Sequence, residues 1–244
     1  MAKTAYNILE EKFTSKITVL NIAVPTACLE PDSAKGECLR KNYNVHLVKA
    51  LNDEDIKVYC RDTNNIRPLC DSEVISESTP ILDVIEILCS KEQVFVKVKR
   101  NITHLVTRSD LDTIPVRIWL YGMISLFEVE LKAKIIRELI NWEDLLPSAR
   151  LEKAKELYLL KKSKNEEINM LGCTQLVDLG TIIFKSWEHF QTFFPSDLSK
   201  NTIRSSFSEI NFLRDTLAHG QKLQQEWPEI HDLIQLISFS LRTV

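Results

Sequence analysis

The chain has little of what would make it fibrous, membrane-spanning or broadly basic. Its 244 residues include only 5 glycines and 8 prolines, which excludes a fibrous or linker-like composition. The longest uncharged apolar run, residues 118–127, is about half of the roughly 20 residues that a membrane-spanning helix needs. With 31 Lys and Arg against 34 Asp and Glu, the net charge is −3, so a contact with nucleic acid requires a local site.

The sequence also lacks a metal-ligand pattern and a secretory leader. Its 6 cysteines lie apart, with no CxxC pair and no histidine at zinc-ligand spacing, so we expect reduced thiols and no metal site. The first residues, MAKTAYNILEEKFTSK, are charged throughout and contain no apolar core. We therefore expect a cytoplasmic protein without a membrane anchor.

Up to residue 112, apolar residues occur in short β-branched runs, which favour strands. Strands are predicted over residues 17–24, 45–48, 56–59, 94–98 and 102–106. A helix is predicted over residues 81–88, with Thr79 as N-cap and Pro80 in the first turn. Lys99-Arg100-Asn101 predicts a hairpin turn in which Asn101 supplies the residue that tolerates a positive φ.

From Pro115 onward, apolar residues recur every three or four positions, as in helices. Helices are predicted over residues 114–140, 148–162, 174–185, 202–219 and 228–241. The fold class is therefore α+β and multidomain, with an α/β domain at residues 1–112 and an all-α bundle at residues 113–244. The first bundle helix is apolar nearly all round between Ile114 and Phe127, so we expect a homodimer in which a second subunit covers part of it.

A short repeat occurs inside the first domain. Residues 58–62 (VYCRD) resemble residues 106–110 (VTRSD), 48 positions further along, which suggests two copies of one βαββα unit. In each copy a hydroxyl-bearing residue ends a strand and an acid follows three places later. The two pairs are Tyr59 with Asp62, and Thr107 with Asp110. Such a pair can hold the two hydroxyls of a ribose beside a helix N-terminus, or it can simply cap the helix, which spacing alone favours.

The segments TPILDVIEIL and QVFVKVKRNITHLVTRSDL resemble a cystathionine-β-synthase (CBS) domain. In that family a strand ending in Gly-hydrophobic-hydrophobic-Thr-x-x-Asp holds the ribose of an adenine nucleotide. The likeness covers residues 16–112 as a tandem pair, matches at Thr107 and Asp110, and departs at Tyr59 and at His104, which replaces the glycine. The resemblance implies that both hydroxyl and carboxylate pairs bind an adenine nucleotide as a regulator, or that the pair serves only for dimerisation.

Residues 202–219 predict an amphipathic helix. Its apolar stripe is Ile203, Phe207, Ile210, Leu213 and Leu217, and its polar face holds Arg204, Ser208, Asn211, Asp215 and His219, with Arg214 beside them. Gly220 follows as a C-cap candidate, so His219 lies in the last turn, where the helix dipole favours a protonated imidazole. Asp215 is four residues before His219, so its carboxylate can orient the ring. Without further information, such a pattern is typical of a solvated helix face with a capping histidine.

The segment SEINFLRDTLAHGQ resembles the signature of HEPN domains (higher eukaryotes and prokaryotes nucleotide-binding), in which four to six residues separate an arginine from a histidine. Here these are Arg214 and His219, and the likeness covers residues 114–244. Many HEPN domains are metal-independent endoribonucleases that act as dimers. The resemblance implies that a ribose 2′-hydroxyl attacks the adjacent phosphate and leaves a cyclic 2′,3′-phosphate. His219 would act as general acid or base, Arg214 would hold the phosphate, and Asp215 would orient His219 or the attacking hydroxyl.

Two details complete this expected site. Arg214 lies about 140° round an ideal helix from His219, so a second copy of the helix across a dimer is needed to close a phosphate site. Glu128, on the first bundle helix, would be an additional polar residue of the cleft, unless it is an ordinary exposed acid.

The two resemblances together predict a CBS-like pair fused to a HEPN-like bundle, with two alternative functions. The first is a metal-independent endoribonuclease that cuts RNA without a cofactor and is controlled by an adenine nucleotide, as in bacterial toxins or anti-phage effectors. The second is a non-catalytic nucleotide-sensing regulator or a dimerising scaffold. The intact Arg214 and His219 favour the first, whereas Tyr59 and His104 weaken the nucleotide-sensing part of both.

Overall fold

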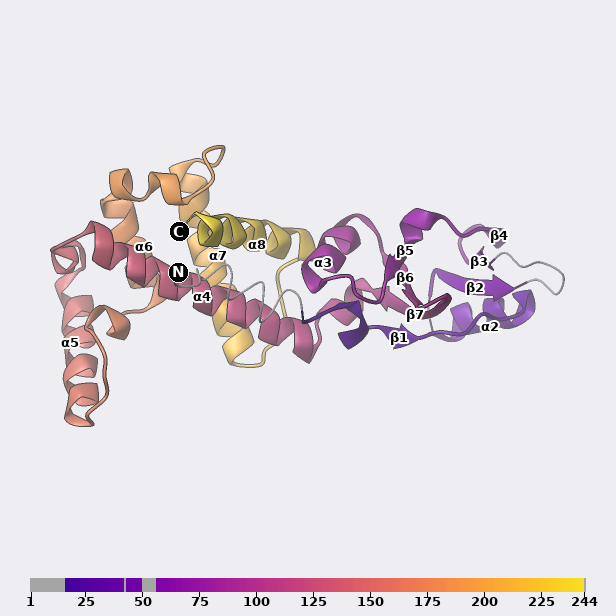
Figure 1. The fold of residues 1–244 in the computed structure, drawn as a ribbon, viewed down its shortest axis with the longest axis horizontal. Helices are drawn as coiled ribbons and strands as arrows, with labels where there is room; N and C mark the ends of the chain where they lie inside the picture. Colours follow the sequence, from indigo (N-terminus) through magenta and orange to yellow (C-terminus); the bar gives the residue numbers. More distant parts are fainter. Residues whose placement is uncertain (1–15, 42, 50–55, 244) are drawn as a thin grey trace. The chain divides into compact units, whose positions relative to one another are not determined.

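The computed structural model describes residues 16–41, 43–49 and 56–243 (Figure 1). The described residues divide into two compact units, one up to Val116 and the other from Arg117 onward, a few residues after the seam expected near residue 112. The fold is mixed α and β: both sheets lie in the first unit, and the second unit is built of helices. The charged N-terminal segment, from which we expect a cytoplasmic protein, lies outside the described residues.

The first unit contains two sheets. One has the strand order β1 (Val24–Pro25), β7 (Asn101–Thr107), β6 (Gln93–Val98) and β5 (Val74–Ser76). The other has the order β2 (Val45–Lys49), β3 (Ile56–Cys60) and β4 (Asn65–Pro68). β5 runs parallel to β6, and the other pairs are antiparallel, with Val94 opposite Val106 and Leu47 opposite Val58.

The order strand, helix, strand, strand occurs twice in this unit. The first run is β1, α2 (Pro31–Lys41), β2 and β3, and the second is β5, α3 (Ile81–Ser90), β6 and β7. Helix α3 lies where the sequence predicts it, but Pro80 rather than Thr79 is at the N-cap position. The repeat predicts a helix that begins at Asp62, as one would at Asp110. This prediction is wrong, because Asn64 adopts a left-handed φ of 50° and closes a turn that leads into β4.

The two sheets share one core, because successive side chains along each strand point to opposite faces of the sheet. The buried residues at its centre are Leu47, Val58, Phe95 and Leu105, two from each sheet. The next residues along, Val48 and Tyr59, point to the opposite face and pack against Ala34 and Cys38 of α2. The three-stranded sheet is therefore covered by α2 on one face and by the four-stranded sheet on the other.

Two local predictions differ from the structure. The strand expected over residues 17–24 is replaced by η2 (Val19–Asn21) and the short β1, because the Asn21 side chain accepts the Thr18 N–H at 2.8 Å and turns the chain. The hairpin turn between β6 and β7 is at the predicted place. However, Lys99 rather than Asn101 has the positive φ, 55°, because Asn101 already pairs with Val98 in the sheet.

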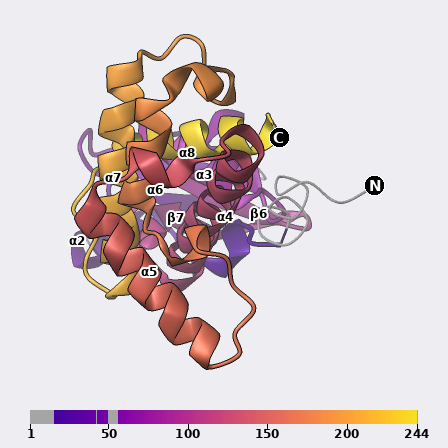
Figure 2. The same cartoon turned by 90° about the vertical axis from the view of Figure 1, so that its left-hand side faces the viewer.

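The described part of the second unit forms five α-helices where five were predicted, with ends that differ by at most two residues. They are α4 (Ile114–Glu138), α5 (Ser148–Ser163), α6 (Leu176–Lys185), α7 (Lys200–Ala218) and α8 (Trp227–Arg242). Figure 2 shows α5 projecting from the other helices, and Ala154 is the buried residue of this helix. Among the described residues, no helix is long and apolar enough to cross a membrane.

An aromatic cluster fixes α7 against its neighbours. The ring of Phe207 lies 5.6 Å from Phe127 of α4, 5.3 Å from Phe184 of α6 and 5.9 Å from Phe194, measured between ring centroids. Offset and edge-on contacts of this kind add about 0.5–1.5 kcal/mol each to the area that they bury. The cluster holds one face of α7 inward and therefore turns the polar face outward.

Candidate functional site

The candidate site lies at the C-terminal end of α7. The helix begins after Ser199, whose hydroxyl accepts the Thr202 N–H at 3.1 Å, and it ends at His219, which is followed by Gly220 with a φ of +63°. The predicted stripe of Ile203, Phe207, Ile210 and Leu213 is buried, as is Thr216, whereas Leu217 is half-buried. These caps and this stripe leave His219 exposed at the helix end.

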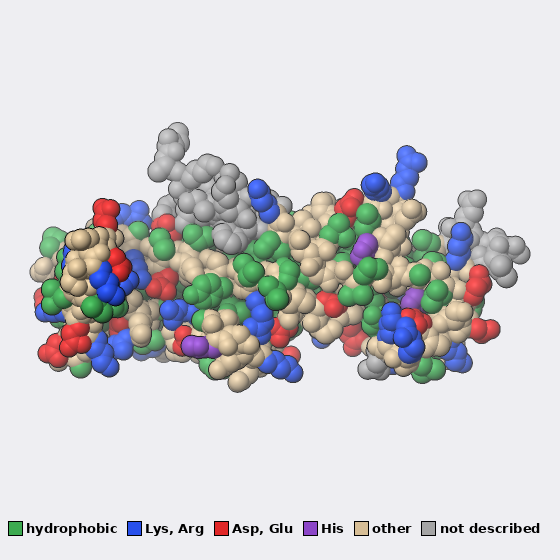
Figure 3. Space-filling view, turned by 90° about the horizontal axis from the view of Figure 1, so that it is seen from below, with side chains coloured by type: hydrophobic (Ala, Val, Ile, Leu, Met, Phe, Trp, Pro, Cys, Tyr) green, Lys and Arg blue, Asp and Glu red, His purple; other side chains and the backbone are tan. Residues whose placement is uncertain are grey.

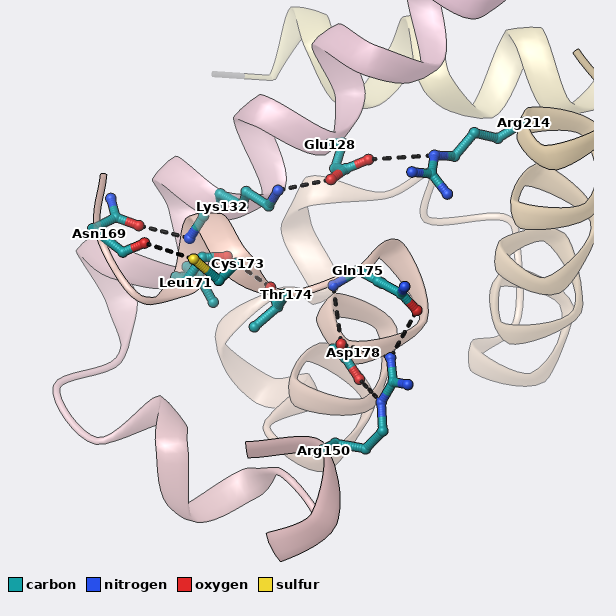
Figure 4. Close-up of polar contacts among 11 residues, drawn as sticks. Glu128, Lys132, Arg150, Asn169, Leu171, Cys173, Thr174, Gln175, Asp178 and Arg214 are labelled. Carbon is teal, nitrogen blue, oxygen red and sulfur yellow. Dashed lines mark hydrogen bonds and ion pairs between the residues drawn. The ribbon is translucent and has the colours of Figure 1, made fainter. Parts of the chain in front are cut away.

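Arg214 is held by two carboxylates. Its Nε lies 3.8 Å from Oε2 of Glu128 on α4, and its Nη1 donates to Oδ1 of Asp215 at 3.1 Å. Oε1 of Glu128 also accepts a hydrogen bond from Lys132 at 2.7 Å (Figure 4). A chain of alternating charges thus joins α4 to α7, and it includes three of the predicted site residues, Glu128, Arg214 and Asp215.

His219 is not joined to Asp215 as the spacing suggests. The Asp215 carboxylate accepts from Arg214 at 3.1 Å and from the Asn211 amide at 3.5 Å. Asp215 contacts His219 through the backbone, where the His219 N–H donates to the Asp215 carbonyl at 3.0 Å. Within the described part of the chain, the His219 ring has no hydrogen-bond partner. The full positive charge of the neighbouring guanidinium explains why the carboxylate turns to Arg214 rather than to the ring.

Sequence reasoning missed two cations of α4. Lys132 binds Glu128, and the Arg117 guanidinium donates to the carbonyl of Gln221, two residues after His219. Arg117, Glu128 and Lys132 are eleven and four residues apart, which places them on one face of α4. That spacing could have identified the two cations as neighbours of Glu128 from the sequence.

In the second repeat, the Thr107 and Asp110 side chains bind each other. Thr107 is the N-cap of η4 (Arg108–Leu111), and Oδ2 of Asp110 accepts both the N–H and the hydroxyl of Thr107 at 2.7 Å. This is the capping arrangement that the spacing favoured. Arg108 points away, with its guanidinium donating to the carbonyls of Leu88, Cys89 and Lys91 at the end of α3.

A cavity of about 440 Å³ lies beside this pair. Its lining includes Lys41, Tyr43, Asn44, Glu92 and Thr107. The Asn44 amide donates to Glu92, and these residues stand directly before β2 and β6, at matching places in the two copies. Lys41 lies 5.8 Å from the centre of the Tyr43 ring. The cavity therefore combines a hydroxyl, an aromatic ring and a cation at the junction of the copies.

The corresponding pair in the first copy is not assembled. Tyr59 is buried and its hydroxyl donates to Asn64 at 3.1 Å, while Asp62 is exposed in the turn that precedes β4. His104 is half-buried in β7, with Nδ1 2.9 Å from the Thr103 hydroxyl. The first copy thus lacks the hydroxyl and carboxylate contact of the second.

Figure 4 also shows a polar cluster that joins α5 to α6. Arg150 of α5 donates from Nε and Nη2 to the buried Asp178 of α6 at 2.7 and 2.8 Å, which raises the pKa of the guanidinium. Asp178 also accepts the Gln175 N–H at 2.9 Å. Both carboxylate oxygens of Asp178 are engaged by Arg150 or Gln175, so we interpret this cluster as structural.

Surface charge is mixed on the face drawn in Figure 3. Lys and Arg side chains alternate with Asp and Glu, and hydrophobic side chains lie between them. On this face an anionic partner has to be held by a local site. In the described part of the chain, no three His, Cys, Asp or Glu side chains gather closely enough to hold a metal ion.

Comparisons with known proteins give no assignment. No protein-family model, curated protein or solved structure matches this chain. The functional argument therefore rests on the side chains themselves.

Proposed function

We propose that the protein is a metal-independent endoribonuclease of the HEPN type, with Arg214 and His219 as its catalytic residues. The observation that supports this most directly is that an exposed imidazole and a carboxylate-held guanidinium both lie near the C-terminal end of one helix. An imidazole can accept and release a proton near neutral pH, and the planar guanidinium fits a phosphate.

The proposed reaction divides the work between these groups. His219 takes the proton from a ribose 2′-hydroxyl, whose oxygen attacks the adjacent phosphorus. The bond from phosphorus to the 5′-oxygen breaks, leaving a cyclic 2′,3′-phosphate on one fragment and a 5′-hydroxyl on the other. Arg214 stabilises the charge that develops on the phosphate, a contribution of about 10²–10³ in rate for one good donor. Glu128 keeps Arg214 in place, and Asp215 shares that task.

A homodimer completes this mechanism. One imidazole cannot remove one proton and deliver another in the same step, so His219 of a second copy protonates the leaving 5′-oxygen. Helix α4 supports this: it buries one face and leaves Ile118, Tyr121, Val129 and Ile136 exposed along the other. An uncovered apolar stripe of this length favours association with a second copy.

We further propose that an adenine nucleotide regulates the enzyme through the cavity beside Thr107. The Thr107 hydroxyl and the Asp110 carboxylate can bind ribose, and Tyr43 can stack on a base. Such control suits a toxin or an anti-phage effector, in which RNA cleavage has to be restrained until it is needed.

One observation favours the alternative of a non-catalytic regulator or dimerising scaffold. Both Glu128 and Asp215 bind Arg214, so the charge that would hold a phosphate is already offset by carboxylates. A phosphate has to compete with both of them. In a scaffold, the same contacts would serve only to join α4 to α7.

The deciding experiment is cleavage of total RNA, and of single RNA species, by the purified protein. We expect the parent to cut and His219→Ala and Arg214→Ala to be inactive yet folded, because both side chains lie outside the core. His189→Ala, at another exposed histidine, is the matched control and should cut normally. Cleavage by His219→Ala at the parent's rate would make the nuclease proposal wrong and leave the scaffold.

A further inference from the structure

A groove of about 360 Å³ lies between α6 and α7, away from the residues assigned above. Its apolar wall consists of Val177, Phe184 and Phe207, and Lys185 and Arg204 line it as well. No acidic side chain lines it within the described residues. The groove therefore offers an apolar surface next to positive charge, the combination that a nucleotide requires.

The two cations of this groove are available for a ligand. In the described part of the chain, neither Lys185 nor Arg204 has a carboxylate partner, and the Arg204 guanidinium lies 5.0 Å from the centre of the Phe184 ring. By contrast, several other cations of the helical unit are ion-paired: Lys132, Lys134, Arg150, Lys161 and Arg214. The positive charge of the groove is thus not offset by the protein.

The groove and the candidate site share one face of α7. Arg204, Ser208, Asn211, Asp215 and His219 follow at spacings of four, three, four and four residues, which keeps them within about 80° of one another on an ideal helix. At 1.5 Å per residue, Arg204 and His219 lie about 22 Å apart along the axis. A few nucleotides of extended single strand can span that distance along the exposed face.

Gly180 contributes to the depth of the groove. A Cβ atom at this position would lie 3.2 Å from the Phe207 ring, so a larger residue would push against the wall. The glycine therefore lets the Phe207 ring of α7 pack closely against the α6 backbone and keeps the aromatic wall in place. An unpaired base can contact this wall, whereas the bases of a duplex are stacked inside it and cannot enter.

We propose that this groove is a subsite for single-stranded RNA, in which an unpaired base packs against Phe184 and Phe207 and the flanking phosphates contact Arg204 and Lys185. This inference rests on the proposed function, because the strand bound here continues along α7 to His219. The subsite would hold the RNA several nucleotides from the bond that is cut and would favour single strands over duplexes.

The test is fluorescence anisotropy of a labelled 2′-O-methyl single strand, which has no free 2′-hydroxyl and stays uncut by the full-length protein. Arg204→Gln should weaken binding about tenfold, and Lys185→Gln should also weaken it. Each substitution should reduce the slope of log Kd against log salt by about 0.7, the value for one lost phosphate contact on a single strand. The matched controls Arg137→Gln on α4 and Lys153→Gln on α5 are exposed and lie outside the groove, so they should change neither quantity.

Three further probes distinguish single-stranded RNA from other ligands. The same strand annealed to its complement, free AMP and polyglutamate should all bind weakly, without dependence on Arg204. Equal binding of the duplex would show that the groove attracts nucleic acid only through its positive charge, without preference for single strands. AMP as tight as the strand would identify a mononucleotide site, and Arg204-dependent polyglutamate binding would identify a docking site for an acidic protein. Each of these results, or no binding of the single strand by the parent, would overturn the proposal.

Cleavage assays separate this proposal from the nuclease proposal. Arg204→Gln should raise KM for a long RNA and leave kcat unchanged, whereas His219→Ala should abolish kcat and still bind the uncut strand. If the parent cuts no RNA but binds the strand through Arg204, the nuclease proposal fails and the subsite stands. If the parent cuts RNA and Arg204→Gln changes neither KM nor Kd, the subsite fails and the nuclease stands. Circular dichroism of both groove variants verifies their fold.

Discussion

Oε2 of Glu128 lies 3.8 Å from Nε of Arg214, although α5 and α6 separate the two helices along the chain. Glu128 is 17% exposed and Arg214 31%, so solvent screens the pair only in part. The same carboxylate also binds Lys132. Glu128 therefore sets both the position and the free charge of the guanidinium, and a phosphate that reaches Arg214 has to compete with it.

Glu128→Gln should tighten RNA binding and slow cleavage. Loss of the carboxylate charge frees Arg214, and about 1 kcal/mol for a partly exposed ion pair corresponds to about fivefold in Kd. The guanidinium is then less firmly oriented, so the single-turnover rate at saturating RNA should fall. Lys132→Gln keeps the contact between Glu128 and Arg214 and should not tighten binding. Weaker binding by Glu128→Gln would contradict this role.

Association through α4 predicts a dimer in solution. Ile118 and Val129 are 57% and 58% exposed on the same helix, and burial of their remaining exposed surface is worth about 1–2 kcal/mol each. Light scattering at micromolar concentration should give twice the 28.2 kDa of the chain. Ile118→Asp and Val129→Asp should each give monomers without nuclease activity. Ile140→Asp, at an exposed position beyond the end of α4, is the control and should remain dimeric.

An adenine nucleotide that binds beside Thr107 should raise the melting temperature. A ligand selective for the folded state stabilises it by about 2.7 kcal/mol at one hundred times its Kd. Asp110→Ala should remove the shift, because it deletes the carboxylate that accompanies the Thr107 hydroxyl. Asp62→Ala should retain it, since Asp62 lies in an exposed turn. A shift that survives Asp110→Ala would place the nucleotide elsewhere, and the absence of any shift would contradict nucleotide binding by the first unit.

Local patterns were sufficient for the helices of the second unit. The stripe of Ile203, Phe207 and Leu213 at helical spacing, with Gly220 after it, predicts α7 to within two residues at either end. The hairpin of β6 and β7 could also be predicted from the sequence, since the two apolar runs are short and a single turn separates them. In these segments nearest neighbours along the chain decide the conformation.

Long-range packing decided the rest. The contact of Glu128 with Arg214 depends on how α4 lies against α7, about which helical periodicity carries no information. Asp215 and His219 have the right spacing for a contact, but Arg214 competes for the carboxylate. Lys99 takes the left-handed conformation because strand register, rather than its own preference, places it first in the loop.

The first unit should lose stability in acid through the ion pair of Arg67 and Glu73. Two hydrogen bonds of 2.7 and 2.6 Å from Arg67, together with the Cys70 N–H at 3.0 Å, hold the pKa of Glu73 below its usual value. A carboxyl pKa that is lower in the folded state stabilises the fold above the unfolded pKa, and the effect disappears as the pH falls through the folded pKa.

The consequence is measurable by urea unfolding. Arg67→Gln should be less stable than the parent at neutral pH, and the difference should shrink below about pH 4. Asp71→Asn changes a neighbouring acid outside this pair and should not show that pH dependence. A difference between the parent and Arg67→Gln that stays constant down to about pH 3 would show that the pair has no such effect.

The chemistry of cleavage gives the most specific prediction. If the 2′-hydroxyl is the nucleophile, a substrate with a single 2′-deoxy group at the cut position should resist cleavage there and still bind. The fragment upstream of the cut should carry a cyclic phosphate, and EDTA should leave the rate unchanged, because the proposed mechanism uses proton transfer by His219 and charge stabilisation by Arg214 without a metal ion.

Arg214→Lys extends this test, because it keeps the positive charge and loses the planar fork that contacts two phosphate oxygens. It should retain RNA binding and lose most of kcat, while Lys153→Arg, an exposed change on α5, should alter neither. Full activity of Arg214→Lys would mean that charge alone is sufficient at this position. Inhibition of the parent by EDTA, or cutting at a 2′-deoxy position, would instead show that a different nucleophile breaks the phosphate bond, and the roles of His219 and Arg214 would have to be abandoned.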